Sequence, residues 1–564
     1  MQCTLSEPNR FSYFITNFHT IYLRARNDAR AREEKHACIQ KSPKHRLNSK
    51  TRINTTFNHL LNSPARANVV FINDFPHTKQ YVIRASVGMP VEERKSAKIT
   101  LVNPPLPPKA FLHPQFPLIG LAYMAATLEK NGYEVTVVDC PPLNMTHEGL
   151  KQEIVRLEPD IVGITSMTVT FQSALQAARV TKESYPRALI VLGGPHATVM
   201  DEQTLSEHKE VDIVARGECE RTISELARYV SNHCLKDLQK VAGITFRKDG
   251  QIVRTPNRPF IQNLDELPYP AYKYFTLRKY RYLGKLTLPI MASRGCPFQC
   301  AVCLASRMSG KRVRTRNPKN VVDELEWLRD THGADAFTFH DPTFTLDKKR
   351  VFEICEEINS RKIALPWDCS TRVDQVSKAV LAKMRAANCQ LVGLGVESNS
   401  QKILNAMKKG TTTEQNERAV GWAKEVDISF GVFLIIGYPG ETIDTLKESL
   451  DFVRRTEPDD VYISFAMPYP STEFYDLVKE MGWKMSTDWS RYDNVTPVFE
   501  NPLLPDDKLM DTRKKFYNNF YSPAYILHQS LKRNFYSQIM ARTALNHILW
   551  RTKLPKLVPG ILRK

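Results

Sequence analysis

Short apolar runs alternate with helical hydrophobic patterns over much of the first half of the chain. The apolar runs are 99–102, 134–139, 161–165, 188–192 and 213–215, and helical patterns near 118–130, 150–157 and 171–184 separate them. Buried strands that alternate with helices are typical of a parallel α/β sheet. We therefore predict a Rossmann-like, doubly wound parallel sheet over residues 97–235, with ligand-binding loops at the carboxyl ends of its strands.

The same alternation returns in the second half of the chain, from 286 to 505. Strands are predicted at 286–291, 336–339, 367–372, 390–396, 430–436 and 461–465. Six strand–helix units predict a partial (β/α)6 barrel of the TIM type that is open on one side. Functional side chains of such barrels come from the loops that follow the strands.

A connector is predicted over 236–285, between these two α/β regions. It contains a short hairpin with Asp249 and Gly250 at its turn, followed by the proline-rich stretch 264–270.

The last segment, 506–564, is predicted to be helical and basic. Leu527, Leu531, Phe535 and Ile539 recur every four residues, which is typical of a helix packed on a core. Residues 512–564 also hold eleven Lys and Arg and no acidic residue. Peripheral contact of this helix with an anionic membrane is therefore an alternative to simple core packing.

The first 96 residues show no sustained hydrophobic period and are rich in Arg, Asn, Thr and His. We predict a basic, disordered extension. Met89 stands just before the first predicted strand, so the upstream part is alternatively a mis-assigned start or an arginine-rich targeting arm. Because no eighteen consecutive apolar residues occur, we expect no membrane-spanning helix.

Charge and cysteine content narrow the function. The formal net charge of the 564 residues is +19, but residues 89–511 carry 54 basic and 55 acidic side chains. The excess charge thus belongs to the two ends, and we expect no nucleic-acid partner for the neutral core. The eleven cysteines are scattered apart from one motif, which is typical of a protein of the reducing cytoplasm.

That motif consists of Cys296, Cys300 and Cys303, which follow the first strand predicted for the barrel. Three thiolates favour iron–sulfur or zinc. A structural zinc site needs four protein ligands, and the next cysteine, Cys355, lies about fifty residues away in a helical pattern. Three thiolates on a [4Fe–4S] cluster leave one iron open to a small molecule, which makes a catalytic cluster the preferred interpretation.

The Cys-x3-Cys-x2-Cys loop resembles the signature of the radical S-adenosylmethionine (SAM) superfamily, and the resemblance extends over residues 97 to about 500. It implies that the three cysteines hold a [4Fe–4S] cluster that binds and reductively cleaves SAM. It also implies a reductant such as ferredoxin or flavodoxin. Val302 departs from the family pattern, because an aromatic residue that packs on the adenine usually stands there.

The resemblance further implies SAM contacts on the loops that follow the barrel strands. Glu397, with Ser398 beside it, would accept hydrogen bonds from the ribose hydroxyls. Asp341 and Thr343 would meet the methionyl amine, and Arg372 would face the carboxylate of the cofactor or of the substrate.

Two of these assignments have structural alternatives. Gly437 and Gly440 would let the backbone approach the adenine closely, although tight turns alone would also explain them. Glu397 would alternatively form a salt bridge at the barrel rim.

Loops at the carboxyl edge of the first predicted sheet resemble the cobalamin-binding domain of one large radical SAM subfamily. The implied contacts are Ser166, Thr168, Gly193, Gly194, His196, Gly217 and Glu218. No Asp-x-His-x-x-Gly follows the first strand, so we expect no histidine from that loop beneath the cobalt. His196 is a candidate substitute, but a local hydrogen bond is the preferred interpretation. A Rossmann-like domain that has lost its cofactor is the alternative for the whole region.

The resulting hypothesis is a radical SAM enzyme that functionalises an unactivated carbon of a small apolar molecule, by methylation or oxidative cyclisation. The subfamily includes enzymes that modify hopanoids and archaeal lipids, and the anaerobic Mg-protoporphyrin monomethyl ester cyclase, so a lipid or tetrapyrrole-like substrate is implied. One alternative is an RNA methylthiotransferase, an enzyme that carries a second set of three cysteines in its N-terminal domain. Residues 97–235 of this chain hold only Cys140, Cys219 and Cys234, and two of them lie in unrelated loops. The other is a non-catalytic iron–sulfur protein.

Overall fold

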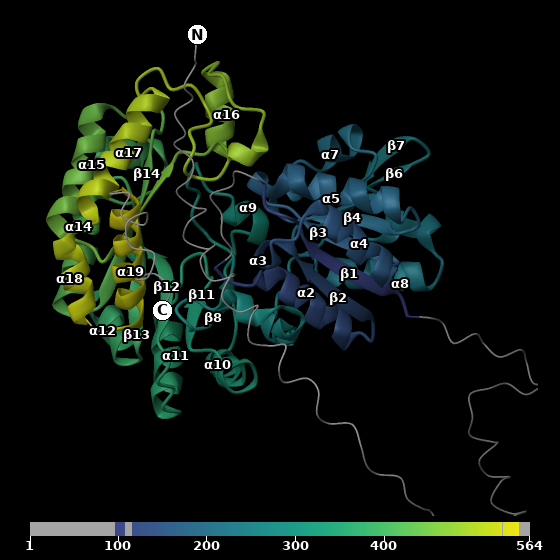
Figure 1. Cartoon of the computed structure of the whole chain (residues 1–564), viewed down its shortest axis with the longest axis horizontal. Helices are drawn as coiled ribbons and strands as arrows, with labels where there is room; N and C mark the ends of the chain where they lie inside the picture. Colours follow the sequence, from purple (N-terminus) through teal and green to yellow (C-terminus); the bar gives the residue numbers. More distant parts are fainter. Residues whose placement is uncertain (1–95, 108–114, 533, 552–564) are drawn as a thin grey trace, which may run out of the picture. The chain divides into compact units, whose positions relative to one another are not determined.

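The computed structural model describes residues 96–107, 115–532 and 534–551 (Figure 1). The extension predicted over 1–96 lies outside these residues except for Ser96. The first sheet has seven strands in the order β2-β1-β3-β4-β5-β6-β7. Its strands are β1 (Lys98–Asn103), β2 (Glu134–Asp139), β3 (Ile161–Thr165), β4 (Leu189–Gly193), β5 (Ile213–Ala215), β6 (Ile244–Lys248) and β7 (Gln251–Arg254).

Helices cover both faces of this sheet, as predicted. Leu101 and Val102 are consecutive residues of β1 and belong to two separate buried cores, because successive side chains of a strand point to opposite faces. The helices of this region are α2 (Ile119–Lys130), α3 (Cys140–Leu143), α4 (His147–Leu157), α5 (Phe171–Ser184), α6 (Pro195–Val199), α7 (Asp201–Glu207) and α8 (Glu220–Ser231). The doubly wound fold is therefore confirmed.

The hairpin predicted as part of a connector belongs to the first sheet instead. β6 pairs antiparallel with β5, and Thr245 lies opposite Val214. Ile244, Thr245 and Phe246 are buried, so the hairpin covers an edge of the sheet that would otherwise expose unpaired backbone groups. The prediction of a separate connector is wrong for these residues.

The second sheet has six strands in the order β15-β14-β13-β12-β11-β8, and every neighbouring pair is parallel. They are β8 (Thr287–Ile290), β11 (Ala336–Phe339), β12 (Trp367–Arg372), β13 (Cys389–Glu397), β14 (Ser429–Ile436) and β15 (Asp460–Phe465). This arrangement confirms the predicted partial barrel. A separate ribbon of β9 (Ser293–Arg294) and β10 (Arg314–Thr315) follows β8.

The barrel helices begin at recognisable capping residues. Thr412 and Thr442 form capping boxes with Gln415 and Thr445 at the starts of two of them. The helices are α9 (Ala305–Ser309), α10 (Pro318–His332), α11 (Lys348–Ser360), α12 (Lys378–Ala386), α13 (Gln401–Ala406), α14 (Thr413–Glu425), α15 (Ile443–Thr456) and α16 (Glu473–Glu480).

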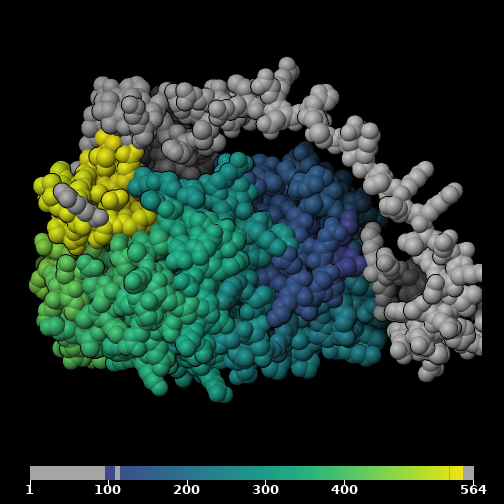
Figure 2. All heavy atoms as spheres, turned by 90° about the horizontal axis from the view of Figure 1, so that it is seen from below, coloured from purple at the N-terminus to yellow at the C-terminus, as the bar shows by residue number. Residues whose placement is uncertain are grey.

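Three C-terminal helices, α17 (Asp506–Phe520), α18 (Pro523–Lys532) and α19 (Phe535–Arg551), pack on the barrel. They are the yellow elements beside the green barrel helices (Figures 1 and 2). Tyrosines make the contacts: the Tyr517 hydroxyl donates to the Val461 carbonyl at 3.1 Å, and the Tyr536 hydroxyl donates to Asp368 at 2.6 Å.

The buried face of these helices differs from the apolar stripe predicted from the sequence. Leu527 and Leu531 are 62% and 68% exposed, whereas Gln529 and Tyr536 are buried. The prediction that the stripe packs on the core is thus wrong for the two leucines, because polar side chains of the opposite face meet the strand ends. Within the described ranges, no helix combines the length and apolar character needed to span a membrane.

Candidate functional site

The three motif cysteines lie in the loop that joins β9 to β10. Gly295 has φ +99°, and a Cβ there would lie 2.3 Å from the Arg312 carbonyl oxygen, so only glycine fits. The Cys296 amide donates to the Gly310 carbonyl at 3.0 Å and closes the base of the loop. Cys296 is buried and Cys303 is exposed, so the loop is reached from one side.

The cysteine loop fits a multi-iron cluster better than a mononuclear zinc site. In the part of the chain that the structure describes, no three His, Cys, Asp or Glu side chains converge on one metal position. Structural zinc requires four ligands around one ion, whereas the thiolates of a [4Fe–4S] cluster bind separate irons. Burial raises the pKa of the Cys300 thiol, so metal binding must offset the cost of its ionisation.

Arg372, at the end of β12, positions this loop. Its guanidinium lies 3.7 Å from the centre of the Phe298 ring, and its Nη1 lies 3.4 Å from the Cys300 sulfur. Asp374 accepts two hydrogen bonds from it at 2.9 and 3.0 Å. Burial is the larger influence on the Cys300 pKa, but Lys409 and Arg372 act to lower it. Asp374 thus supplies a carboxylate partner within the chain, and the contact of Arg372 with the carboxylate of the cofactor or of the substrate stays a prediction.

Glu397 ends β13 at the barrel rim. Its Oε1 lies 2.7 Å from the Lys409 ammonium, so the alternative of a rim salt bridge describes this structure. The residue has φ +63°, which is uncommon for a non-glycine residue, and the strand register shifts beside it. Its partly exposed carboxylate remains a candidate for ribose contact.

Ser398 lies inside the protein next to Glu397, and its predicted place beside the ribose stays a prediction. It is fully buried, and its hydroxyl lies 3.1 Å from the Ser449 hydroxyl of α15. It also accepts a hydrogen bond from the Ser400 amide at 3.1 Å. Ser398 therefore anchors the turn after β13 because both of its hydrogen-bonding partners are internal.

Asp341 and Thr343 are also directed inward. Asp341 accepts hydrogen bonds from the Ser293 hydroxyl and from the Ala292 amide, the latter at 3.0 Å. Its other neighbour is Arg350, at 3.7 Å. The Thr343 hydroxyl donates to the Pro342 carbonyl at 2.8 Å. Asp341 therefore fixes the chain just before the cysteine loop, and the contact of these two residues with a methionyl amine stays a prediction.

Gly437 and Gly440 both adopt positive φ, +84° and +87°. The Gly437 amide donates to Glu441 at 2.5 Å, and its carbonyl accepts from Asn501 at 3.0 Å. A Cβ on Gly440 would meet nothing within 4 Å, so open space adjoins this turn. Tight-turn geometry accounts for both glycines, and the space beside Gly440 keeps the predicted adenine contact open.

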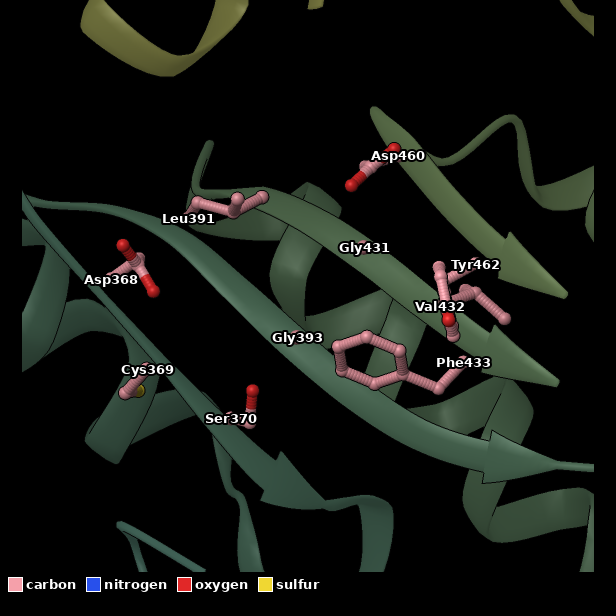
Figure 3. A pocket seen from close by; sticks show the side chains of 10 residues that line it. All are labelled: Asp368, Cys369, Ser370, Leu391, Gly393, Gly431, Val432, Phe433, Asp460 and Tyr462. Carbon is pink, nitrogen blue, oxygen red and sulfur yellow. The ribbon is translucent and has the colours of Figure 1, made fainter. Parts of the chain in front are cut away.

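The barrel interior contains a small cavity of about 70 Å³ (Figure 3). It lies among side chains of β12, β13, β14 and β15. Apolar walls come from Leu391, Val432, Phe433 and Tyr462, and carboxyl groups from Asp368 and Asp460. Burial raises the pKa of both carboxyl groups to about 6.

At the carboxyl edge of the first sheet, the predicted glycines create a close backbone approach. Gly194 has φ +94°, and a Cβ there would lie 2.5 Å from the Ser166 carbonyl oxygen. The Ser166 hydroxyl donates to the Gly193 carbonyl at 3.0 Å, which joins the loops after β3 and β4. Gly217, after β5, has φ +73° and open space where a side chain would be.

His196 is buried at the same edge and forms the local hydrogen bond that the sequence favoured. Its Nδ1 lies 3.2 Å from the Thr168 hydroxyl, while its Nε2 is buried without a hydrogen-bond partner. Its ring lies between Phe171, at 4.1 Å, and Trp489, at 4.9 Å. Burial lowers its pKa to about 4, so the ring is neutral at pH 7.

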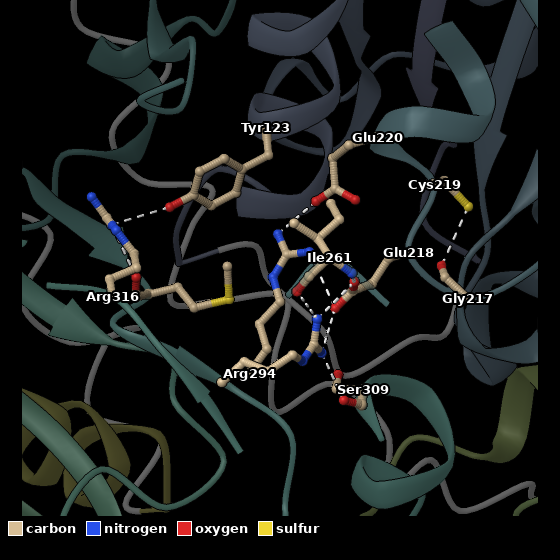
Figure 4. A network of polar contacts seen from close by, with 11 residues as sticks. Tyr123, Gly217, Glu218, Cys219, Glu220, Ile261, Arg294, Ser309 and Arg316 are labelled. Atoms are coloured by element: carbon tan, nitrogen blue, oxygen red, sulfur yellow. Dashed lines mark hydrogen bonds and ion pairs between the residues drawn. The ribbon is translucent and has the colours of Figure 1, made fainter. Parts of the chain in front are cut away.

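Glu218, which the sequence predicts to contact a cofactor, pairs with arginines of the ribbon formed by β9 and β10 (Figure 4). Its carboxylate accepts hydrogen bonds from Arg314 at 2.9 and 2.7 Å and from the Ile261 amide at 2.8 Å. Its side chain is 9% exposed, which leaves little surface for a ligand. The local motif did not reveal this long-range pairing, and the cofactor contact of Glu218 stays a prediction.

Both sheets match known families. Residues 112–227 match the B12 binding domain, and residues 290–453 match the radical SAM superfamily. An uncharacterized methyltransferase of Pyrococcus horikoshii is 32% identical over 429 residues, which are 76% of this chain and 93% of the relative. The anaerobic magnesium-protoporphyrin IX monomethyl ester cyclase of Rubrivivax gelatinosus is 32% identical over 431 residues, which cover 73% of this chain and 77% of the cyclase.

The chain belongs to the cobalamin-dependent radical SAM enzymes. A solved structure of the radical SAM methyltransferase TsrM from Kitasatospora setae has the same fold, with a TM-score of 0.59 and 21% identity over 70% of this chain and 81% of TsrM. The cofactors of this radical SAM enzyme are a [4Fe–4S] cluster, SAM and cobalamin. The cysteine loop and the glycine-lined edge of the first sheet fit them.

Several residues of this radical SAM site were missed from the sequence. Lys409 and Asp374 orient Glu397 and Arg372, yet they stand outside every motif. Phe298 lies inside the cysteine motif, and its aromatic side chain is the sequence feature that could have identified it. Trp489 follows the barrel strands in sequence and reaches the first sheet only through the fold.

Proposed function

We propose that this enzyme functionalises an unactivated carbon of a largely apolar small molecule, part of which enters the barrel cavity. The observation that carries the proposal is the cavity wall of Leu391, Val432, Phe433 and Tyr462 inside a radical SAM barrel. When bound, the cluster and SAM would supply a carbon-centred radical after an electron arrives from a ferredoxin- or flavodoxin-type reductant. The wall excludes water from the reacting carbon, and the Asp368 and Asp460 carboxyl groups orient a hydrogen-bond donor of the substrate.

The relatives act by methylation or by ring closure, and both are consistent with this cavity. We favour methylation of a lipid or tetrapyrrole-like molecule. Product analysis separates the two reactions: methyl transfer consumes one SAM as methyl donor and another as radical source, whereas cyclisation needs no methyl donor. Equal amounts of S-adenosylhomocysteine and 5′-deoxyadenosine are therefore expected.

The test is an anaerobic reaction of the reconstituted chain with magnesium-protoporphyrin monomethyl ester or an isoprenoid lipid. Mass spectrometry measures the two nucleoside products and the mass change of each substrate. Phe433→Ala should lower substrate-dependent turnover, while Leu143→Ala, an exposed surface control, should not. Equal turnover of wild type and Phe433→Ala would contradict binding in this cavity.

A second proposal concerns location. We infer a cytoplasmic enzyme that contacts membranes through α18, because Leu527 and Leu531 are exposed apolar residues within an acid-free basic segment. Vesicles containing anionic lipid should sediment the wild type more strongly than Leu527→Ser/Leu531→Ser, and salt should weaken the binding. Leu503→Ser removes another exposed leucine outside the helix and serves as the control. Equal sedimentation of all three proteins would contradict membrane contact.

A further inference from the structure

Two buried arginines face each other at the base of the cysteine loop. Arg294 of β9 lies directly opposite Arg314 of β10 in the antiparallel ribbon. Their side chains are 9% and 3% exposed. Like charges at opposed positions repel, and a buried charge without a partner is strongly destabilising. The ribbon that leads into the cysteine loop therefore requires anions from elsewhere in the fold.

Those anions come from the loop after β5 and from the first residue of α8 (Figure 4). Glu218 meets Arg314 at 2.7 Å and Arg294 at 3.4 Å, and Glu220 meets Arg294 at 2.5 Å. Burial would raise the Glu218 pKa, but the two arginines together hold it below its usual value. Glu218 is thus ionised at neutral pH, and its carboxylate pairs with both arginines of the ribbon.

The positions of these residues give the network its significance. Arg294 stands two residues before Cys296, the first cysteine of the loop. Glu218 directly follows Gly217 at the edge that fits cobalamin, and Glu220 begins α8, where the helix dipole favours a carboxylate. The Tyr123 ring of α2 lies 5.5 Å from the Arg294 guanidinium and shields it from water. One polar network therefore joins the loops of the two cofactor sites.

We propose that Glu218 and Glu220 are positioning residues that, through Arg294 and Arg314, fix the cluster loop relative to the cobalamin edge. Neither carboxylate contacts a reacting atom in this arrangement. Each acts through an arginine of the ribbon, so that the two sites keep one separation. The inference depends on the cofactors of the family and not on the substrate, so its outcome is independent of the proposed function.

The direct test is pulsed electron paramagnetic resonance on the full-length, cofactor-loaded chain. It measures the dipolar coupling between cob(II)alamin and the reduced cluster in wild type, Glu218→Gln/Glu220→Gln and the control Glu266→Gln. Glu266 is an exposed partner of Arg221 at 3.0 Å, so its replacement removes a carboxylate without changing the ribbon. Wild type and control should give one narrow distance distribution and the double variant a broad one. A narrow, unchanged distribution in the double variant would overturn the proposal.

Hydrogen exchange provides a second readout on the cofactor-free chain. In the double variant, amides of 292–315 should exchange about tenfold faster or more, because charge-assisted hydrogen bonds that hold the ribbon are lost. If the double variant does not fold, exchanging the charges of Arg314 and Glu218 provides the test. Arg314→Glu alone should lose protection of the ribbon, and adding Glu218→Arg should restore it. Absence of any restoration would overturn the proposal.

Discussion

Gly194→Ala tests whether the loop after β4 is built around a residue without a side chain. Gly194 has φ +94° and ψ 178°, a region that is essentially restricted to glycine and costs other residues about 1–3 kcal/mol. The new Cβ would also lie 2.5 Å from the Ser166 carbonyl oxygen and 2.8 Å from its nitrogen. Both are backbone atoms, so the clash adds to the conformational cost.

This free-energy loss corresponds to a fall of roughly 5- to 150-fold in the folded-to-unfolded ratio. Urea unfolding of the cofactor-free chain measures it, and gel filtration measures the cobalamin that each variant retains. Gly193→Ala is the matched control, because its Cβ would approach no atom closer than 3.7 Å. Equal unfolding midpoints in the two variants would refute the reasoning.

Two further predictions concern the barrel. Arg372→Met should speed the release of iron to a chelator, because Cys300 loses a neighbouring cation and Asp374 loses its ion-pair partner. The control is Arg385→Met, which replaces a partly exposed arginine, and equal release rates in the two variants would contradict the prediction. Burial raises the pKa of Glu441 from 4.5 to about 8. Between these two values the folded state keeps a proton that the unfolded state loses, so the free energy of unfolding should fall as the pH rises from 4.5 to about 8. Glu441→Gln should flatten this part of the stability profile, measured by urea unfolding at several pH values, and an unchanged slope would count against a buried protonated carboxyl.

Both sheets were predictable because strand and helix periods are local properties of the sequence. The run 336–339 coincides with β11, and 171–184 coincides with α5. The hairpin around Asp249 was recognised, but its place in the first sheet was not, because pairing of β5 with β6 depends on contacts between separate segments.

The candidate site was predictable only where a motif holds the chemistry within a few residues. Cys296, Cys300 and Cys303 share one loop, as their spacing indicated. Glu218 and Arg314 are 96 residues apart, and no local pattern reveals that they form a buried pair. The inward orientation of Asp341 likewise depends on Ser293 and Arg350, which come from other segments.

Metal analysis of the anaerobically reconstituted full-length chain tests the central claim most directly. The account predicts about four irons and one cobalt per wild-type chain. Cys303→Ala should lose the irons and retain the cobalt, because Cys303 is exposed and lies outside the glycine-lined edge of the first sheet. Retention of the full iron content by Cys303→Ala, or a wild-type chain that binds no cobalt, would contradict the account.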